Sequence, residues 1–155
     1  MRTPFAENFN DSSVFKNPDF QIPIGYVNDF ASILDSTETN LLENKLRAYD
    51  EKTSNQIAII SINSDKLTED NFDQFSIDLS NYWGVGTAEK NNGIAICLSP
   101  GLRMIRINTG IGTKHILTDE ICQQVLDSII MPEFREGNYY KGINRAVDEF
   151  IRLWR

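Results

Sequence analysis

Cysteine and histidine are scarce in this sequence, whose 155 residues include two cysteines and one histidine. Cys97 and Cys122 form no C-x-x-C motif and each lies in an apolar pattern, so we expect two small core residues without a redox role. His115 stands alone, and no G-x-S-x-G motif offers it a serine nucleophile. We therefore expect His115 on a surface loop, and the sequence disfavours a hydrolase built on a nucleophile and a base.

Clusters of basic residues and long apolar runs are also missing. The formal net charge is -7, and a chain without clustered lysine and arginine is not expected to bind nucleic acid. Such a chain is better suited to cations or basic partners. No apolar run approaches the roughly 20 residues of a membrane span. Residues 1–15 contain no apolar signal segment, so we expect a cytoplasmic protein without a membrane span.

The pattern that is present predicts one globular domain over residues 24–155, preceded by a polar, flexible N-terminal arm over residues 1–23. The segment over residues 24–34 is short and is expected to be irregular. The other predicted elements are four helices and three strands. The first three helices have their N-caps at Ser36 or Thr37, at Thr68 and at Thr118, the third ends at Met131-Pro132, and the last begins near Asn138. The strands are expected over 56–62, 93–98 and 102–108.

This order of elements predicts a three-layer α/β/α sandwich with a mixed, mainly parallel sheet. A helix joins the first two strands, which should therefore be parallel with a right-handed crossover. The turn at Ser99-Pro100-Gly101 makes the second and third strands a hairpin. In sheets of this kind, ligands gather at the carboxyl ends of the parallel strands.

Two glycine-containing segments are candidates for binding a ligand. In "NYWGVGTAEKNNGIAICLS", Gly84 follows a helix and Gly93 opens a strand, which is the reverse of the order in a phosphate-binding loop. Gly84 is therefore expected to end the helix in a left-handed conformation. In "INTGIGTKHILTDE", Gly110 and Gly112 follow a strand, and Asp119 lies in the first turn of the next helix. This segment fits a plain loop or a cation-lined loop, and fits a direct anion site less well because the carboxylate would repel phosphate.

The segment "CLSPGLR" has the C-x5-R spacing of cysteine-dependent phosphatases. In those enzymes the arginine opens a helix and backbone amides surround the phosphate. Here the residues after Arg103 alternate as a strand, and Pro100 lacks an amide that such a ring needs. We therefore expect a hairpin at this position. Oxygen ligands remain, since Asp29, Asp35, Asp78 and Asp119 lie near the ends of predicted elements and could contribute to a Ca²⁺ or Mg²⁺ site.

Several of these segments occur together in one order: "GYVNDFASIL", "TSNQIAIISINS", "YWGVG", "NNGIAICLS", "RMIRINTGIG", "LTDE" and "MPEFREGNYYKGI". From Ile24 to Trp154 the chain resembles the TPM domain family, named after thylakoid-lumen, photosystem-repair and transmembrane proteins. The resemblance implies a Rossmann-like three-layer fold and a divalent cation, usually calcium, bound by acidic side chains at one end of the sheet. One thylakoid member is described as an acid phosphatase, and other members look like accessory modules in repair or receptor assembly.

The resemblance also implies roles for individual residues. Asp29 and Asp119 match acidic positions and would bind the cation, together with a backbone carbonyl of the loop between Gly110 and Gly112. Arg106 matches a basic position that would hold an anion. The positions that shape the neighbouring loop are Trp83, Gly84, Asn92 and Gly93.

Two functions follow from the sequence as hypotheses. The first is a domain that binds calcium or magnesium and acts as an interaction or assembly module, with a protein as a further partner. The second is a metal-assisted phosphatase for phosphomonoesters, in which a bound cation polarises the phosphoryl oxygen and Arg106 or Lys114 steadies negative charge.

Overall fold

The structure of the chain is a computed structural model that describes residues 23–85 and 92–154. The predicted N-terminal arm lies outside the described residues apart from Pro23, and so do Gly86 and Asn91 of the first glycine segment. In the described part, no helix is long and apolar enough to cross a membrane.

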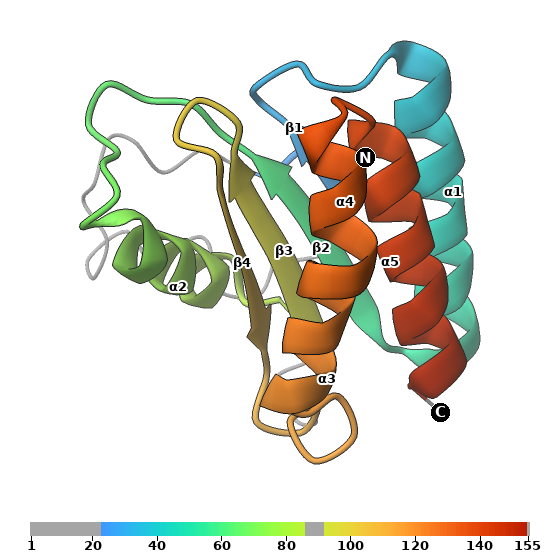
Figure 1. The fold of residues 1–155 in the computed structure, drawn as a ribbon. Helices are drawn as coiled ribbons and strands as arrows, with labels where there is room; N and C mark the ends of the chain where they lie inside the picture. Colours follow the sequence, from blue (N-terminus) through green and yellow to red (C-terminus); the bar gives the residue numbers. More distant parts are fainter. Residues whose placement is uncertain (1–22, 86–91, 155) are drawn as a thin grey trace.

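The described residues form four strands and a set of helices (Figure 1). In chain order they are β1 (Val27–Asp29), α1 (Ser36–Thr53), β2 (Gln56–Ser61), α2 (Phe72–Trp83), β3 (Gly93–Ser99), β4 (Met104–Thr109), α3 (Asp119–Val125), the π-helix η1 (Leu126–Ile130), α4 (Met131–Arg135) and α5 (Tyr139–Leu153).

The strands form one open sheet in the order β1-β2-β3-β4. β1, β2 and β3 are parallel, and β4 is antiparallel to β3, as the hairpin at Ser99-Pro100-Gly101 predicts. All residues of β2 and β3 are buried, whereas β4 is half-buried. The runs of β-branched and small apolar residues in β2 and β3 therefore mark strands covered on both faces.

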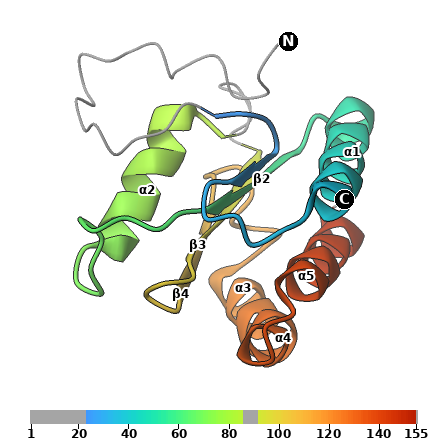
Figure 2. The same cartoon turned by 90° about the horizontal axis from the view of Figure 1, so that it is seen from above.

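Helices cover both faces of this sheet. α2 lies on one face, and α1, α5 and the α3–α4 segment lie on the other (Figure 2). The core between the layers contains aromatic and aliphatic side chains from every layer, including Leu42 of α1, Phe72 of α2 and Phe150 of α5, all fully buried. The structure therefore confirms the predicted three-layer α/β/α sandwich with a mixed, mainly parallel sheet.

The segment over residues 24–34 is not irregular throughout, as the sequence led us to expect. It contains β1, whose register pairs Val27 with Ile59 and Asp29 with Ser61. The buried Asn28 side chain accepts the backbone N–H groups of Ile24 and Gly25 at its Oδ1 and donates its Nδ2 to the carbonyl of Ile59. A strand of three residues has no period to detect, so tertiary pairing makes it a strand.

The first helix begins at Ser36, and the expected N-cap at Ser36 or Thr37 is one or two residues too late. The N-cap is Asp35, whose side chain accepts the backbone N–H of Glu38 at 2.8 Å. The Glu38 side chain accepts the N–H of Asp35 at 3.0 Å, which completes a capping box. Leu41, one of the apolar residues at helical spacing in this segment, is 54% exposed. The buried stripe is formed by Leu42, Leu46 and Tyr49.

At the second helix, the first helical residue is Phe72 rather than one directly after Thr68, and the N-cap position is Asn71. Thr68 still contributes, since its hydroxyl accepts the N–H of Asn71 at 3.3 Å and its own N–H donates to the Asn71 side chain at 2.8 Å. The helix ends as predicted, because Gly84 has a left-handed backbone with φ of 64°.

The prediction that Met131-Pro132 ends the third helix is wrong. The helix continues through η1 into α4, up to Arg135. Within η1 the N–H of Met131 donates to the carbonyl of Leu126, five residues earlier. Pro132 has no N–H to give to the preceding turn, and the wider π turn accommodates this loss without breaking the helix. The last helix follows where it was expected, with Asn138 at its N-cap position.

Candidate functional site

A polar pocket of about 450 Å³ lies where β4 ends, between α2 and the loop that leads to α3. The parallel strands begin at this end of the sheet. We call this row of strand ends the amino edge of the sheet. Five residues singled out from the sequence line the pocket, namely Gly84, Arg106, Gly110, Lys114 and Asp119. We call it the β4–α2 pocket.

The wall of this pocket is fixed by contacts between β4 and α2. The Nδ2 of Asn108 donates to the hydroxyls of Ser76 and Ser80, at 3.3 Å each. The Oδ1 of Asn108 accepts from Nε of Arg106 at 2.8 Å. The guanidinium of Arg106 also lies 3.8 Å from the carboxylate of Asp73, on the rim. The sequence analysis missed Asn108, although alternation along the strand places it on the same face as Arg106.

The floor of the pocket is the second glycine segment. The N–H of Gly110 donates to the carbonyl of Gly93 at 2.9 Å, which ties the loop to the start of β3. The carbonyl of Gly110 accepts the N–H groups of Thr113 and Lys114, so the loop folds back on itself. Gly112 does not line the pocket. Between the two glycines, Ile111 is 80% exposed.

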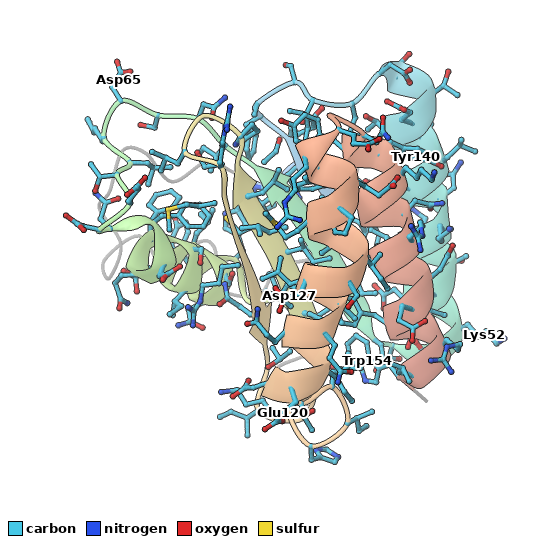
Figure 3. The ribbon with its side chains drawn as sticks, in the orientation of Figure 1. Lys52, Asp65, Glu120, Asp127, Tyr140 and Trp154 are labelled. Atoms are coloured by element: carbon cyan, nitrogen blue, oxygen red, sulfur yellow. The ribbon has the colours of Figure 1, made fainter. Side chains whose placement is uncertain are left out.

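Asp119 stands at the start of α3, beside this loop. The helix is capped by Thr118, whose hydroxyl accepts the N–H of Ile121 at 3.3 Å, so the Asp119 side chain is not needed as a cap. Its carboxylate is exposed and forms no hydrogen bond or ion pair with another described residue. Figure 3 shows its neighbour Glu120 at the foot of the same helix and Asp127 further along it. Asp119 is therefore the carboxylate that the pocket presents to a ligand.

Asp29 lies at the opposite edge of the sheet. It is level with Ser61 of β2, which pairs with Leu98 of β3, whereas Gly110 is level with Gly93. The five residue steps from 93 to 98 correspond to about 16 Å along the strands, and β1 and β4 are about 14 Å apart across the sheet. Asp29 and Asp119 therefore do not share one site. The physical reason is the hairpin, because β4 runs back and delivers its loop to the amino edge.

The Asp29 carboxylate is already engaged by the protein. It accepts the N–H of Ile33 at 3.0 Å, the N–H of Leu34 at 2.8 Å and the hydroxyl of Ser61 at 2.6 Å. These bonds connect the end of β1 to the chain that leads into α1. The structure thus gives Asp29 a role in holding that connection.

Trp83 and Asn92 are also buried rather than open to the pocket. Trp83 is fully buried, and its ring meets that of Phe30 edge to face with centroids 6.3 Å apart. Asn92 donates its Nδ2 to the carbonyl of Ser54 and to Oδ1 of Asn55. Their contacts lie inside the fold, where they connect α2 to the residue after β1 and β3 to the end of α1.

The C-x5-R pair has the hairpin geometry that the sequence predicts. Cys97 is fully buried within β3, and burial raises the pKa of its thiol to about 12. Burial also raises the pKa of the Cys122 thiol to about 11, with the nearby Asp119 charge as a smaller cause. Both groups are therefore protonated at neutral pH and neither has the character of a nucleophile. Both cysteines are core residues, as expected.

A cluster of classical metal ligands is not found in the described part of the chain, where no three histidine, cysteine, aspartate or glutamate side chains gather. Among the described residues, a cation in the β4–α2 pocket would have Asp119 as its one charged ligand, with hydroxyl and carbonyl oxygens for the rest. Hard cations such as Ca²⁺ accept such oxygen ligands. The donor set therefore fits a weak site for a hard cation.

The fold defines the chain as an open mixed α/β sandwich with a polar pocket where its antiparallel strand ends. Within that class, the TPM domain family matches residues 27–153, and the chain belongs to this family. The expected resemblance is thereby confirmed. No curated protein sequence matches the chain.

Two solved structures illustrate the similarity in fold. The N-terminal domain of a protein from P. gingivalis, determined by solution NMR, is 25% identical to this chain with a TM-score of 0.70, and the match covers 99% of this chain and 92% of the other. The BA42 protein from the psychrophilic bacterium Bizionia argentinensis is 16% identical with a TM-score of 0.58, and the match covers 77% of this chain and 80% of the other. The second likeness shows the fold alone.

Proposed function

We propose that this TPM domain binds a divalent cation, with calcium preferred over magnesium, in the β4–α2 pocket and acts as an interaction module. The observation that carries the proposal is the Asp119 carboxylate, which lines a polar pocket beside Gly110 and has no partner among the described residues. A carboxylate in that position can supply the charge that a hard cation needs.

The charges around the pocket set the expected strength of binding. Arg106 and Lys114 line the same pocket and oppose a cation, although Asp73 offsets part of the Arg106 charge. With one carboxylate as ligand, the dissociation constant should be about 10⁻³ M, the weak end of the calcium range. Binding of this strength suits a surface that a partner completes, and the exposed Ile111 beside the pocket offers that partner an apolar contact.

We expect calcium to shift the backbone amide signals of Gly110, Thr113 and Asp119 in the NMR spectrum of the ¹⁵N-labelled chain, and to leave those near Asp29 unchanged. Asp119→Asn should abolish these shifts, because it removes the charge of the carboxylate ligand. The measurement is a titration to about 10 mM, chosen to exceed the expected dissociation constant, with magnesium in a parallel series.

Asp127→Asn is the matched control, since it removes the same charge from an exposed position further along the same helical segment. It should leave the calcium shifts in place. Equal shifts in the wild-type and Asp119→Asn proteins would contradict the assignment of the site, and shifts confined to the surroundings of Asp29 would move it to the other edge of the sheet.

A second candidate, a metal-assisted phosphatase, is favoured by one observation: Arg106 and Lys114 converge on the same pocket as Asp119. Two cations beside a metal-binding carboxylate could hold a phosphoryl group while a bound metal ion polarises it. Neither cysteine has the character of a nucleophile, so a metal-activated water would have to attack.

This candidate predicts slow hydrolysis of para-nitrophenyl phosphate that requires added calcium or magnesium. Arg106→Ala should lower the rate by about 10²-fold, the effect of removing one group that stabilises transition-state charge. Arg145→Ala serves as the control, because Arg145 is exposed on α5 and outside the pocket. Phosphate release at equal rates from the wild-type protein and Arg106→Ala would exclude this activity and leave the binding module.

A further inference from the structure

A second cavity lies at the other edge of the sheet, where the parallel strands end. It is a partly open cavity of about 340 Å³ between two turns, the β3–β4 hairpin and the turn between α4 and α5. Its apolar interior comes from Leu98 and Ile105 of the sheet and from Met131 and Phe134 of the helical segment. A cavity of this size falls at the lower end of the range for small-molecule sites.

Both turns are held firmly. The Oδ1 of Asn63 accepts the N–H of Gly101 at 2.8 Å, which fixes the tip of the hairpin. In the other turn, the N–H of Asn138 donates to the carbonyl of Glu133 at 2.9 Å, and Gly137 takes a φ of 78° that favours glycine. The Phe134 and Tyr139 rings meet edge to face with centroids 5.0 Å apart. The cavity is therefore part of the folded framework.

Each turn contributes one arginine to the cavity, Arg103 from the hairpin and Arg135 from the end of α4. Neither guanidinium forms a hydrogen bond or ion pair with another described residue, and the same is true of the Tyr139 hydroxyl, which also lines the cavity. Among the residues that the structure describes, no acidic one lines it, although the chain has 22 of them. Positive charge is thus concentrated at this cavity in a protein that is otherwise acidic.

We propose that this cavity binds a small amphiphilic anion, a molecule with an apolar body and one carboxylate or phosphate group. The apolar body would lie against Leu98, Ile105 and Phe134, and the anionic group would accept hydrogen bonds from Arg103, Arg135 and Tyr139. Arginine binds both carboxylate and phosphate through paired N–H groups, so the two head groups share one chemistry here. The site is independent of the β4–α2 pocket, which lies at the amino edge of the sheet.

The test is an NMR titration of the ¹⁵N-labelled full chain with decanoate and, separately, with decyl phosphate, both kept below the concentration at which they form micelles. We expect the amides of Arg103, Phe134 and Tyr139 to shift. Arg103→Glu/Arg135→Glu should weaken binding by about ten-fold or more, because hydrogen bonds to a charged group are lost and repulsion replaces them. Tighter binding of decanoate would identify a carboxylate ligand, and tighter binding of decyl phosphate a phosphate monoester.

Three controls make the result decisive. Arg145→Glu reverses one such charge at an exposed α5 position outside the cavity and should bind both probes as the wild type does. Decanol has the same apolar body without the anion and should bind about ten-fold more weakly than decanoate. Acetate should produce no shifts at the same concentrations. Decanol binding as tightly as decanoate, or unchanged binding in the double variant, would overturn the proposal, as would shifts that map to the exposed Ile111 or Leu41 instead.

Discussion

Replacement of Trp83 by alanine is expected to lower the free energy of unfolding by about 3–5 kcal/mol, the usual cost of deleting a large aromatic side chain from a core. The resemblance to the TPM family suggested that Trp83 shapes the loop beside the site. The structure instead places it fully buried at the end of α2, in edge-to-face contact with Phe30. Its removal therefore leaves a cavity between α2 and the sheet, which the surrounding side chains can fill only in part.

Urea denaturation followed by circular dichroism measures this effect. Trp83→Phe should lower the free energy of unfolding by less than half as much as Trp83→Ala, because it retains an aromatic ring in the same place. Ile111→Ala should change stability by less than about 0.5 kcal/mol, since that side chain is 80% exposed. If Trp83→Ala kept wild-type stability but altered the calcium titration, the residue would belong to the site and the packing argument would fail.

The sequence was most informative where a residue type has one dominant structural role. Gly84 ends α2 in the left-handed conformation, and Ser99-Pro100-Gly101 turns the chain into a hairpin. The runs of β2 and β3 are long and apolar enough to indicate buried strands directly. In contrast, β1 has three residues and is recognisable only through its partner β2. The π turn before Pro132 also depends on packing, because a proline alone predicts a helix end.

The candidate site was predictable in its parts but not in its assembly. Arg106, Gly110 and Asp119 do line one pocket. Asp29 was grouped with them because acidic side chains were expected to gather at one end of the sheet. The predicted hairpin already implies that Asp29 and Asp119 lie apart, since an antiparallel β4 must end at the edge where the parallel strands begin. The direction of each strand thus indicates which side chains lie at the same edge of the sheet, and residue types alone do not.

The largest consequence of this correction concerns Asp29. We expect Asp29→Ala to lower the free energy of unfolding by about 2–4 kcal/mol in buffer that contains a chelator and no divalent cation. The substitution removes the acceptor of the Ile33 and Leu34 N–H groups and of the Ser61 hydroxyl. Each bond to a charged acceptor contributes about 1.5–3 kcal/mol, but water reaches this half-buried position and offsets part of the loss. Asp29→Asn should lose about half as much, because one oxygen remains to accept a bond.

Asp65→Ala is the matched control, because Asp65 lies exposed in the loop after β2 and has no partner among the described residues (Figure 3). It should change stability by less than about 0.5 kcal/mol.

The comparison separates two roles for Asp29. A structural carboxylate destabilises the protein when removed, whether or not calcium is present. Removal of a cation ligand leaves the calcium-free protein as stable as the wild type, and only the stabilisation that calcium adds is lost. Because three donors within the chain already satisfy Asp29, we expect the first result. The second result would show that Asp29 is a cation ligand at its own edge of the sheet.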